Sequence, residues 1–288
     1  MATDFYGYDA LLHPAMVSYL EHLVVKGRGN TARTCGESLR QYAGWLAAQG
    51  LDALRVTAAH LDGYLRYLAA TYRTPAGKPL ARTTLATRIA NLKSWYGYLE
   101  CQGILTVDPS RRLHVRVVRS RQVAREHLTL QEATALIQTQ AHALADLKED
   151  SRPWRLALRD LAVQCLTLAT GRRIGGVIQL RVEHVDRARS EIRVEKEKGH
   201  VGRVLPVAGW AMAVLGVYLD RARPWLAQAD APWLFVGRGG KAPISPDMLR
   251  VVLARNLQRT IAANPDLEEL PHKTISWHSL RVSFATLL

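Results

Sequence analysis

The chain has 288 residues, with 39 lysines and arginines against 25 aspartates and glutamates, and a formal net charge of +14 at pH 7. This length permits two modest domains, and the positive charge favours a polyanion such as nucleic acid over an anionic membrane as the partner. No apolar run approaches the ~20 residues that span a bilayer, and the N-terminus lacks the basic start and apolar stretch of a signal peptide. Cys35, Cys101 and Cys165 include no Cys-x-x-Cys pair, which indicates thiols in a reducing cytosol rather than disulfides or zinc ligands. We therefore expect a cytoplasmic protein with neither a membrane partner nor a metal site.

Helical periodicity covers the first hundred residues. Apolar faces at helical spacing recur in four segments, namely 17–24, 30–49, 57–68 and 82–102. Thr57 is placed to cap the third helix at its N-terminus, and Gly103 is placed to end the fourth. Short connections predict a compact domain of four or five helices, with residues 1–108 as its extent.

Cations share the polar sides of these helices with hydroxyl and amide side chains. The cations are Arg33, Arg40, Arg82, Arg88 and Lys93. Residues of these types on one face can bind phosphates and base edges in a groove. Any solvated helix face also carries such residues, so a DNA-binding face and an ordinary surface are weighted about equally here.

A basic and irregular segment, residues 109–127, follows the helical domain. Its cations are Arg111, Arg112, Arg116, Arg119, Arg121 and Arg125, and no acidic residue lies between Asp108 and Glu126. Such a linker between two globular segments can lie along a phosphate backbone and make binding steeply dependent on salt. Basic runs are otherwise often solvated tails. We predict an interdomain linker that contacts DNA.

Residues 128–288 are predicted to form a second domain that mixes helices with a small amount of strand. Thr129-Leu-Gln-Glu132 is a capping box that begins a helix, and Thr170-Gly171 ends a long apolar helix that begins near Pro153. Alternating residues in 191–196 and 203–207 predict a β-hairpin around a Gly-bearing loop.

Two more elements are expected further along this domain. Trp233–Val236 reads as another short strand, and Ser245-Pro246 begins a helix that reaches about Ala263. The fold class is therefore mainly α with a small antiparallel β-sheet or hairpin: an N-terminal helical domain followed by an α+β domain.

Four residues of the second domain are candidates for one anion site. Arg173 follows the Thr-Gly turn, Lys198 lies in the hairpin, and His278 and Arg281 lie one helical turn apart. Two arginines, a lysine and a histidine without a carboxylate suit a phosphate group. Taken singly, each motif is weak evidence for such a site. His-x-x-Arg on a helix, for example, is more often a structural pair than a catalytic one.

In their order and context these motifs resemble those of the tyrosine recombinases, also called the phage integrase family. Thr170-Gly-Arg-Arg-Ile174 resembles the first arginine box, Lys198-Gly199 followed by Arg203 and Pro206 is similar to the lysine-bearing hairpin, and His278-Ser-Leu-Arg281 resembles the H-x-L-R box. The helical domain resembles the SAM-like core-binding domain of the family, and 128–288 its catalytic domain.

The resemblance implies a site-specific recombinase or integrase that acts on double-stranded DNA. A tyrosine attacks a phosphodiester, forming a 3′-phosphotyrosyl link and a free 5′-hydroxyl, and exchange with a second strand reseals the backbone. Arg173 and Arg281 then balance charge on the phosphoryl oxygens, Lys198 protonates the leaving 5′-oxygen, and His278 assists proton transfer or binds an oxygen. The chemistry requires no ATP, metal or other cofactor. The resemblance also implies a homotetramer on paired DNA sites and association with the bacterial nucleoid.

This sequence departs from the family pattern in two places. Gly176 stands where an acidic residue is usual, three positions after Arg173. The nucleophilic tyrosine of the family lies roughly thirty to forty residues beyond the H-x-L-R box, and all ten tyrosines here precede His278. We therefore expect the nucleophile to be absent from this chain, which then lacks the C-terminal end of the domain and does not complete cleavage alone.

A structural consequence is expected at the C-terminal end. Phe284, Leu287 and Leu288 are apolar and lie where the family places covering helices. We therefore predict an exposed apolar patch there.

Two other functions remain open on the sequence. A type IB topoisomerase-like enzyme shares the arginine, lysine and histidine site, although a small helical N-terminal domain argues against it. A catalytically inactive relative that binds DNA as an architectural factor fits Gly176 and the missing tyrosine. A basic helical protein unrelated to DNA is the weakest reading, because three boxes in order are hard to obtain by chance.

Overall fold

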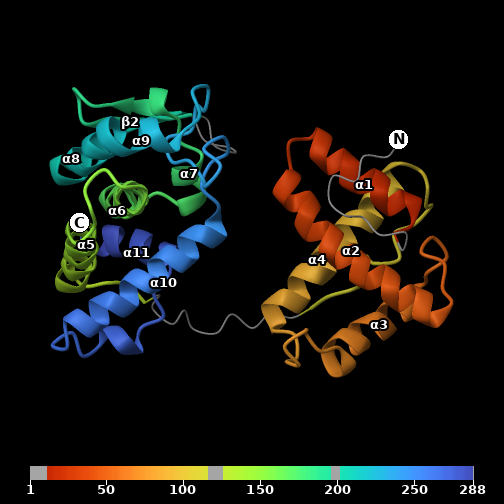
Figure 1. The fold of residues 1–288 in the computed structure, drawn as a ribbon. Coiled ribbons are helices and arrows are strands. Elements are labelled where there is room, and N and C mark those ends of the chain that lie inside the picture. The colour runs from red at the N-terminus through yellow and green to blue at the C-terminus, as the bar shows by residue number, and fades with distance from the viewer. Residues whose placement is uncertain (1–11, 116–125, 196–201, 288) are drawn as a thin grey trace. The chain divides into compact units, whose positions relative to one another are not determined.

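Residues 12–115, 126–195 and 202–287 are described by a computed structural model of the protein (Figure 1). The chain divides into two compact units, Met1–Arg121 and Gln122–Leu288. The division falls inside the segment predicted to be a linker. In the described ranges, every helix is too short or too polar to cross a membrane.

The first unit consists of the helices expected from periodicity. They are α1 (Pro14–Val25), α2 (Gly29–Gln49), α3 (Ala58–Arg66) with the π-helical turn η1 (Tyr67–Thr71), and α4 (Arg82–Cys101). Thr57 caps α3 as predicted: its hydroxyl accepts the His60 amide at 3.4 Å, and the His60 ring accepts the Thr57 amide at 3.2 Å. Gly103, at φ +68°, takes the left-handed conformation that follows α4.

Aromatic side chains fill the centre of this unit. Tyr42, Trp95 and Tyr96 are fully buried. The Tyr42 and Tyr96 hydroxyl oxygens lie 2.8 Å apart, and Tyr96 donates to the Ala53 carbonyl at 3.0 Å. These hydroxyls are therefore buried without losing their hydrogen bonds, which removes the main cost of burying a tyrosine.

The start of the predicted linker packs onto the first unit. Leu113 is 4% exposed and belongs to the core of this unit. The Lys93 ammonium, on α4, donates to the carbonyls of Arg111 at 3.3 Å and Leu113 at 3.1 Å. Residues 109–115 are thus folded, while 116–125 lie outside the described residues.

The second unit is built around α6 (Arg152–Thr170). Figure 1 shows α6 between two groups of elements, with α5 (Leu130–Ala145), α10 (Pro246–Ala263) and α11 (Trp277–Leu287) on one side and α8 (Gly209–Val217) and α9 (Arg223–Leu226) on the other. Short turns complete the helices: α7 (Ile174–Ile178), η2 (Val182–His184), η3 (Tyr218–Ala222) and η4 (Leu270–His272). The predicted capping box is confirmed, because the Thr129 hydroxyl accepts the Glu132 amide and Glu132 accepts the Thr129 amide. Ser245 caps α10 as predicted.

A three-stranded antiparallel sheet lies in the second unit. Its strands, in the order β1-β2-β3, are β1 (Val185–Asp186), β2 (Glu191–Val194) and β3 (Arg203–Pro206). Val194 faces Arg203 in the register, which confirms the predicted hairpin. The two-residue β1 was not predicted, because two residues show no periodicity.

The prediction of a strand at Trp233–Val236 is wrong. Trp233 and Val236 each form only an isolated bridge, to Arg181 and Pro243 respectively. Leu234, Phe235 and Val236 are all fully buried. The apolar run reflects a buried irregular segment, which composition does not separate from a short strand.

Gly171 joins α6 to α11. It ends α6 in the left-handed conformation at φ +58°, and a Cβ atom at this position would lie 2.2 Å from Cδ1 of Phe284. Both the backbone conformation and the close approach of α11 therefore require glycine.

A buried ion pair joins α5 to the segment that precedes α11. Lys273 Nζ lies 2.7 and 2.8 Å from the two carboxylate oxygens of Glu132. Burial of the Glu132 carboxyl opposes ionisation, but the hydrogen bonds from Lys273 and Thr129 outweigh it and hold the pKa of Glu132 below its usual value.

Replacing Gly171 tests the first of these contacts. Gly171→Ala is expected to lower the free energy of unfolding of the second unit by about 3 kcal/mol or more, because alanine is strained at this φ and its methyl group overlaps Phe284. Gly175→Ala is a matched control, since nothing lies within 4 Å of a Cβ there, and it should change stability by less than about 1 kcal/mol. Urea unfolding measures both, and equal stabilities of the two variants would contradict the packing of Phe284 on Gly171.

Acid titration tests the ion pair. Because the pKa of Glu132 is lowered in the folded state, the carboxylate contributes stability above about pH 4.3, the ordinary glutamate pKa, and this contribution disappears as the pH falls through the lowered value. Glu132→Gln combined with Lys273→Met removes both charges and keeps the side-chain volumes. We expect the free energy of unfolding of this double variant to fall less steeply than that of the wild type between about pH 5 and pH 3. Urea unfolding at each pH provides the measurement, and parallel curves would show that the pair contributes nothing.

Candidate active site

The first arginine box forms the turn between α6 and α7. Thr170 closes α6 by donating its hydroxyl to the Leu166 carbonyl at 2.7 Å, and Gly171 reverses the chain. Arg173 then precedes α7, where its carbonyl accepts the amides of Gly176 at 2.8 Å and Val177 at 3.1 Å. The Arg173 side chain is exposed. The turn therefore presents a guanidinium to solvent on a backbone held by hydrogen bonds.

The second box forms the first turns of α11. Ser276 and Ser279 cap the helix reciprocally, with the Ser279 hydroxyl accepting the Ser276 amide at 3.1 Å and the Ser276 hydroxyl accepting the Ser279 amide at 3.3 Å. Trp277 is buried and donates its ring N–H to the Leu249 carbonyl at 2.9 Å. His278, next to it, is exposed in the first turn, at the end of the helix whose dipole favours an anion.

Arg281 brings the two boxes together. Its guanidinium Nη1 donates to the Gly171 carbonyl at 2.6 Å, across 110 residues of sequence. The side chain is half-buried, and the contact holds its cation against Gly171, which lies two residues before Arg173 in the chain. Three of the four predicted site residues thus lie on two segments that touch.

Lys198 falls within 196–201, outside the described residues. The strands on either side of it pair in the register given above, so the hairpin expected to bear this lysine is present.

Gly176 stands where the first box usually has an acidic residue, and its backbone forms a hydrogen bond with Arg172. Arg172 is 5% exposed, and its guanidinium donates to the Gly176 carbonyl at 3.1 Å. The backbone oxygen at this position therefore accepts an arginine hydrogen bond.

Tyr218 is the single tyrosine of residues 122–288, and it faces the core. It is fully buried, and its hydroxyl donates to the Leu234 carbonyl at 2.9 Å. Burial also raises the pKa of Tyr218 well above that of a free phenol. A nucleophile must reach solvent-borne substrate and lose its proton, and Tyr218 can do neither.

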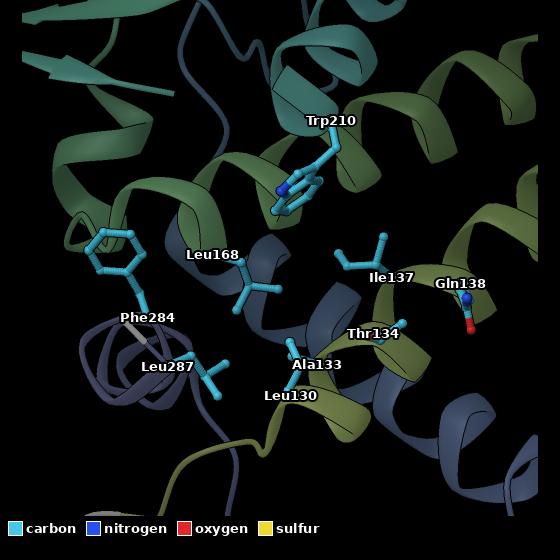
Figure 2. Close-up of a pocket in the computed structure, with 9 residues that line it drawn as sticks. All are labelled: Leu130, Ala133, Thr134, Ile137, Gln138, Leu168, Trp210, Phe284 and Leu287. Atoms are coloured by element: carbon cyan, nitrogen blue, oxygen red, sulfur yellow. The ribbon is translucent and has the colours of Figure 1, made fainter. Parts of the chain in front are cut away.

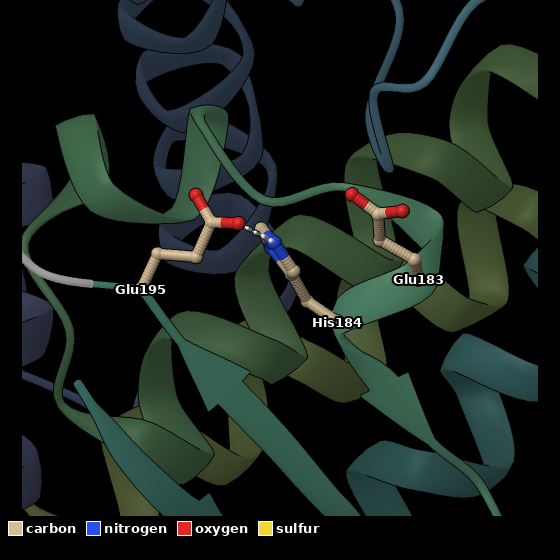
Figure 3. A group of neighbouring side chains, drawn as sticks. All are labelled: Glu183, His184 and Glu195. Atoms are coloured by element: carbon tan, nitrogen blue, oxygen red, sulfur yellow. Dashed lines mark ion pairs between the residues drawn. The ribbon is translucent and has the colours of Figure 1, made fainter.

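Glu183, His184 and Glu195 form a group beside the end of β2 that leads into the hairpin loop (Figure 3). His184 is 7% exposed, and its Nε2 lies 3.2 Å from a Glu195 oxygen. Its Nδ1 accepts the Arg181 amide at 3.1 Å, so the neutral ring carries its proton on Nε2, the nitrogen that faces Glu195. A metal ion needs the Nε2 lone pair, so this arrangement suits a histidine–carboxylate contact rather than a metal ligand.

The predicted DNA contacts of the first unit fall into two groups. Three cations are engaged within the protein: Arg33 with Glu37 at 3.2 Å, Lys93 with backbone carbonyls, and Arg111 with Glu100 at 2.6 Å. The Arg111 guanidinium also lowers the pKa of Glu100.

The other cations are placed differently. Arg82 and Arg112 are exposed, Arg40 is half-buried, and the half-buried Arg88 lies 5.2 Å from the ring centre of Tyr72. Arg116, Arg119 and Arg121 fall outside the described residues. Exposed cations are the ones that can release counterions from DNA, so Arg82 and Arg112 are the strongest candidates for phosphate contacts among the predicted residues that the structure describes.

Two further exposed arginines, on α10, were not among the DNA-binding residues predicted from the sequence. Arg255 and Arg259 are exposed and lie one turn apart on this helix. Their spacing of four residues places both on one face of a helix, and this spacing could have indicated them as a pair of neighbouring cations.

An apolar hollow lies beside the second box (Figure 2). It has a volume of about 380 Å³ and is lined by α5, α6, α8 and α11 through Leu130, Ala133, Thr134, Ile137, Gln138, Leu168, Trp210, Phe284 and Leu287. Leu130 is 67% exposed, Trp210 50% and Leu287 42%. The exposed apolar patch predicted near the C-terminal end is therefore confirmed, with Leu288 outside the described residues.

Comparison with known proteins agrees with this geometry. Residues 128–288 match the phage integrase family, and residues 16–103 match the N-terminal SAM-like domain of phage integrases. The chain is 31% identical over 278 residues to tyrosine recombinase XerC 2 of Ralstonia nicotianae, covering 94% of this chain and 76% of that protein. It is 29% identical over 275 residues to tyrosine recombinase XerD of Corynebacterium glutamicum, covering 94% and 83%.

Solved structures share the fold. A XerH site-specific recombinase in a pre-cleavage complex with its difH substrate superimposes with a TM-score of 0.62 at 17% identity, covering 94% of this chain and 73% of that one. A lambda integrase dimer bound to a COC′ core site gives a TM-score of 0.57 at 16% identity, covering 96% and 89%. The chain belongs to the phage integrase family of tyrosine recombinases, enzymes that break and rejoin DNA.

Proposed function

We propose that this protein is a site-specific DNA recombinase whose second unit binds and polarises the scissile phosphate. Arg173 and Arg281 contact the non-bridging oxygens, His278 binds an oxygen or transfers a proton, and Lys198 protonates the leaving group. The contact between Arg281 and the Gly171 carbonyl at 2.6 Å supports this assignment most directly. It holds the second box against the first in a chain whose relatives are tyrosine recombinases.

The proposed reaction is a phosphoryl transfer that conserves the number of phosphoester bonds. The attacking tyrosine hydroxyl gives its proton to His278 and its oxygen bonds to phosphorus. The bond from phosphorus to the 5′-oxygen breaks, and the leaving oxygen takes a proton from Lys198. Negative charge builds on the phosphoryl oxygens in this step, and fixed guanidinium groups stabilise it without reorganisation. The reverse step, with a 5′-hydroxyl from another strand, reseals the backbone.

We assign the attacking tyrosine to a residue other than Tyr218. The buried hydroxyl of Tyr218 already donates to the Leu234 carbonyl, and the other nine of the ten tyrosines belong to the first unit. The chain then supplies the phosphate site, and attack requires a tyrosine in trans or beyond these residues.

The first unit is proposed to hold the duplex through phosphate contacts. Arg82, Arg88 and Arg112 are the residues proposed for this role among those that the structure describes. Arg116, Arg119 and Arg121, which follow in the chain, are proposed for it as well.

We further propose that the protein acts as a homotetramer on paired sites and is associated with the bacterial nucleoid. Strand exchange between two duplexes needs several active sites, which supports the first of these proposals.

A second candidate function is DNA binding without cleavage, as an architectural factor. The burial of Tyr218 and the glycine at position 176 favour it. The two functions share the DNA contacts and differ only in the covalent step.

Selection from a random duplex pool, followed by an adduct assay on the selected sequence, tests the proposal. We expect a discrete binding sequence, and strand transfer on that sequence when a tyrosine-bearing relative is added. Binding without any sequence preference would contradict the site-specific function, and relaxation of supercoiled DNA lacking the site would favour a topoisomerase. Specific binding with no strand transfer in the presence of the relative would favour the architectural role.

Tyr218→Phe tests the exclusion of Tyr218 as the nucleophile. The variant should form the same amount of covalent protein–DNA adduct as the wild type on a nicked duplex, as judged on a denaturing gel. It should lose only about 1 kcal/mol of stability, the value of one hydrogen bond. An adduct that the wild type forms and Tyr218→Phe does not would overturn the assignment.

Neighbouring arginines test the DNA contacts of the first unit. Arg112→Ala is expected to reduce the slope of log K against log salt by about 1, because an exposed guanidinium is lost from a phosphate. Arg111→Ala should reduce it less, since Glu100 already neutralises Arg111. Fluorescence anisotropy at several salt concentrations measures both slopes, and equal slopes in the two variants would contradict the distinction.

A further inference from the structure

We propose that Glu132 and Lys273 are positioning residues for the phosphate site: their buried ion pair sets the start of α11, and with it the places of His278 and Arg281. This inference rests on the proposed function, because it assumes that α11 binds phosphate. Neither residue reaches the phosphate in this proposal, and each acts through the helix.

The geometry of the pair is that of a fixed contact. The Glu132 side chain is 4% exposed and the Lys273 side chain 20%. Both carboxylate oxygens lie within 2.8 Å of the Lys273 ammonium, and one of them also accepts the Thr129 amide at 2.7 Å. A carboxylate held by two partners inside the protein has little freedom to move, so Lys273 is located relative to the N-terminus of α5.

Two more hydrogen bonds join the residues just before α5 to α11 or to the segment that precedes it. The Ser283 hydroxyl, on α11, accepts the Leu128 amide at 2.8 Å and donates to the Ser279 carbonyl at 2.9 Å. The Thr274 amide donates to the Glu126 carboxylate. The first residues described in the second unit, 126–132, are thus joined both to the segment before α11 and to the helix itself.

The Glu132–Lys273 pair can position the phosphate site because Lys273 lies shortly before α11 in the sequence. Lys273 lies three residues before Ser276, the residue that caps α11, and five before His278. Burial of Trp277 and Leu280 holds the inner face of the helix. Apolar packing is non-directional, so besides the hydrogen bond from the Trp277 ring to the Leu249 carbonyl the start of the helix needs further directional contacts. A charged pair with defined geometry supplies that direction, at a cost in desolvation that apolar residues would avoid.

Phosphate affinity at His278 tests the proposal in the full chain. The probe is inorganic phosphate, followed through the ring ¹H–¹³C signals of His278, which are assigned by their loss in His278→Gln. The test variant is Glu132→Gln combined with Lys273→Met, which keeps the capping acceptor for Thr129 and leaves no buried charge unpaired. We expect its dissociation constant for phosphate to rise by about tenfold or more, as at metal sites that lose a residue orienting a ligand.

Matched variants separate positioning from general stability. Arg187→Met with Asp220→Asn removes an exposed ion pair of the same unit, with contacts at 2.7 and 2.9 Å, and should leave phosphate affinity unchanged. Lys273→Arg keeps the charge and should bind phosphate within about threefold of the wild type. Urea unfolding of each variant confirms that the second unit is folded.

The outcomes are distinct. A double variant that is folded and retains wild-type affinity overturns the positioning role alone. If the double variant does not fold, Lys273→Gln takes its place, because it removes the ion pair and keeps a hydrogen-bond donor for Glu132; unchanged phosphate affinity in that variant overturns the proposal in the same way. His278 signals in the wild type that ignore phosphate overturn the proposed phosphate site itself, and the positioning role with it.

Discussion

The carbonyl of Gly171 is the point on which the second unit depends. It accepts the Arg281 guanidinium at 2.6 Å, while the missing side chain of the same residue leaves room for Phe284. One residue therefore ends α6, receives α11 and precedes the arginines of the first box. A phosphate site made of groups far apart in sequence needs such a junction, because its cations must keep their spacing while no ligand is present.

Local signals in the sequence predicted the boundaries of the elements well. Thr57, Thr129 and Ser245 all cap the helices that they were expected to cap, since the interaction of a cap involves residues only three apart. The hairpin and the break at Gly171 were predicted for the same reason. Trp233–Val236 shows the limit, because an apolar run in a core has the same composition whether or not it pairs as a strand.

Long-range contacts decided which predicted site residues are available for binding, and these could not be read from the sequence. In the sequence, Lys93 looks like a free cation on a helix surface and Arg111 like one in a basic linker. In the structure, Lys93 donates to backbone carbonyls and Arg111 pairs with Glu100. The capping role of Glu132 was predictable, whereas its pairing with Lys273, 141 residues away, was not. The net charge of +14 indicates the kind of partner, but only the fold shows where that charge is exposed. The assignments of Arg173, Lys198, His278 and Arg281 to a phosphate remain predictions from motif order, placed on a compatible geometry for the three that are described.

The aromatic core of the first unit has a spectroscopic consequence. Nine of the ten tyrosines precede residue 99, and the tenth, Tyr218, stacks on Phe235 in the second unit with ring centres 5.4 Å apart. Trp95 touches Tyr96 at 4.5 Å between ring centres and lies 6.3 Å from Tyr42, distances at which excitation energy passes from tyrosine to tryptophan. Five of the seven tryptophans lie in the second unit and absorb in the same band as tyrosine. The share of the emission that enters through tyrosine, obtained by comparing excitation in the tyrosine band with excitation at the red edge where tryptophan absorbs alone, therefore reports mainly on the first unit.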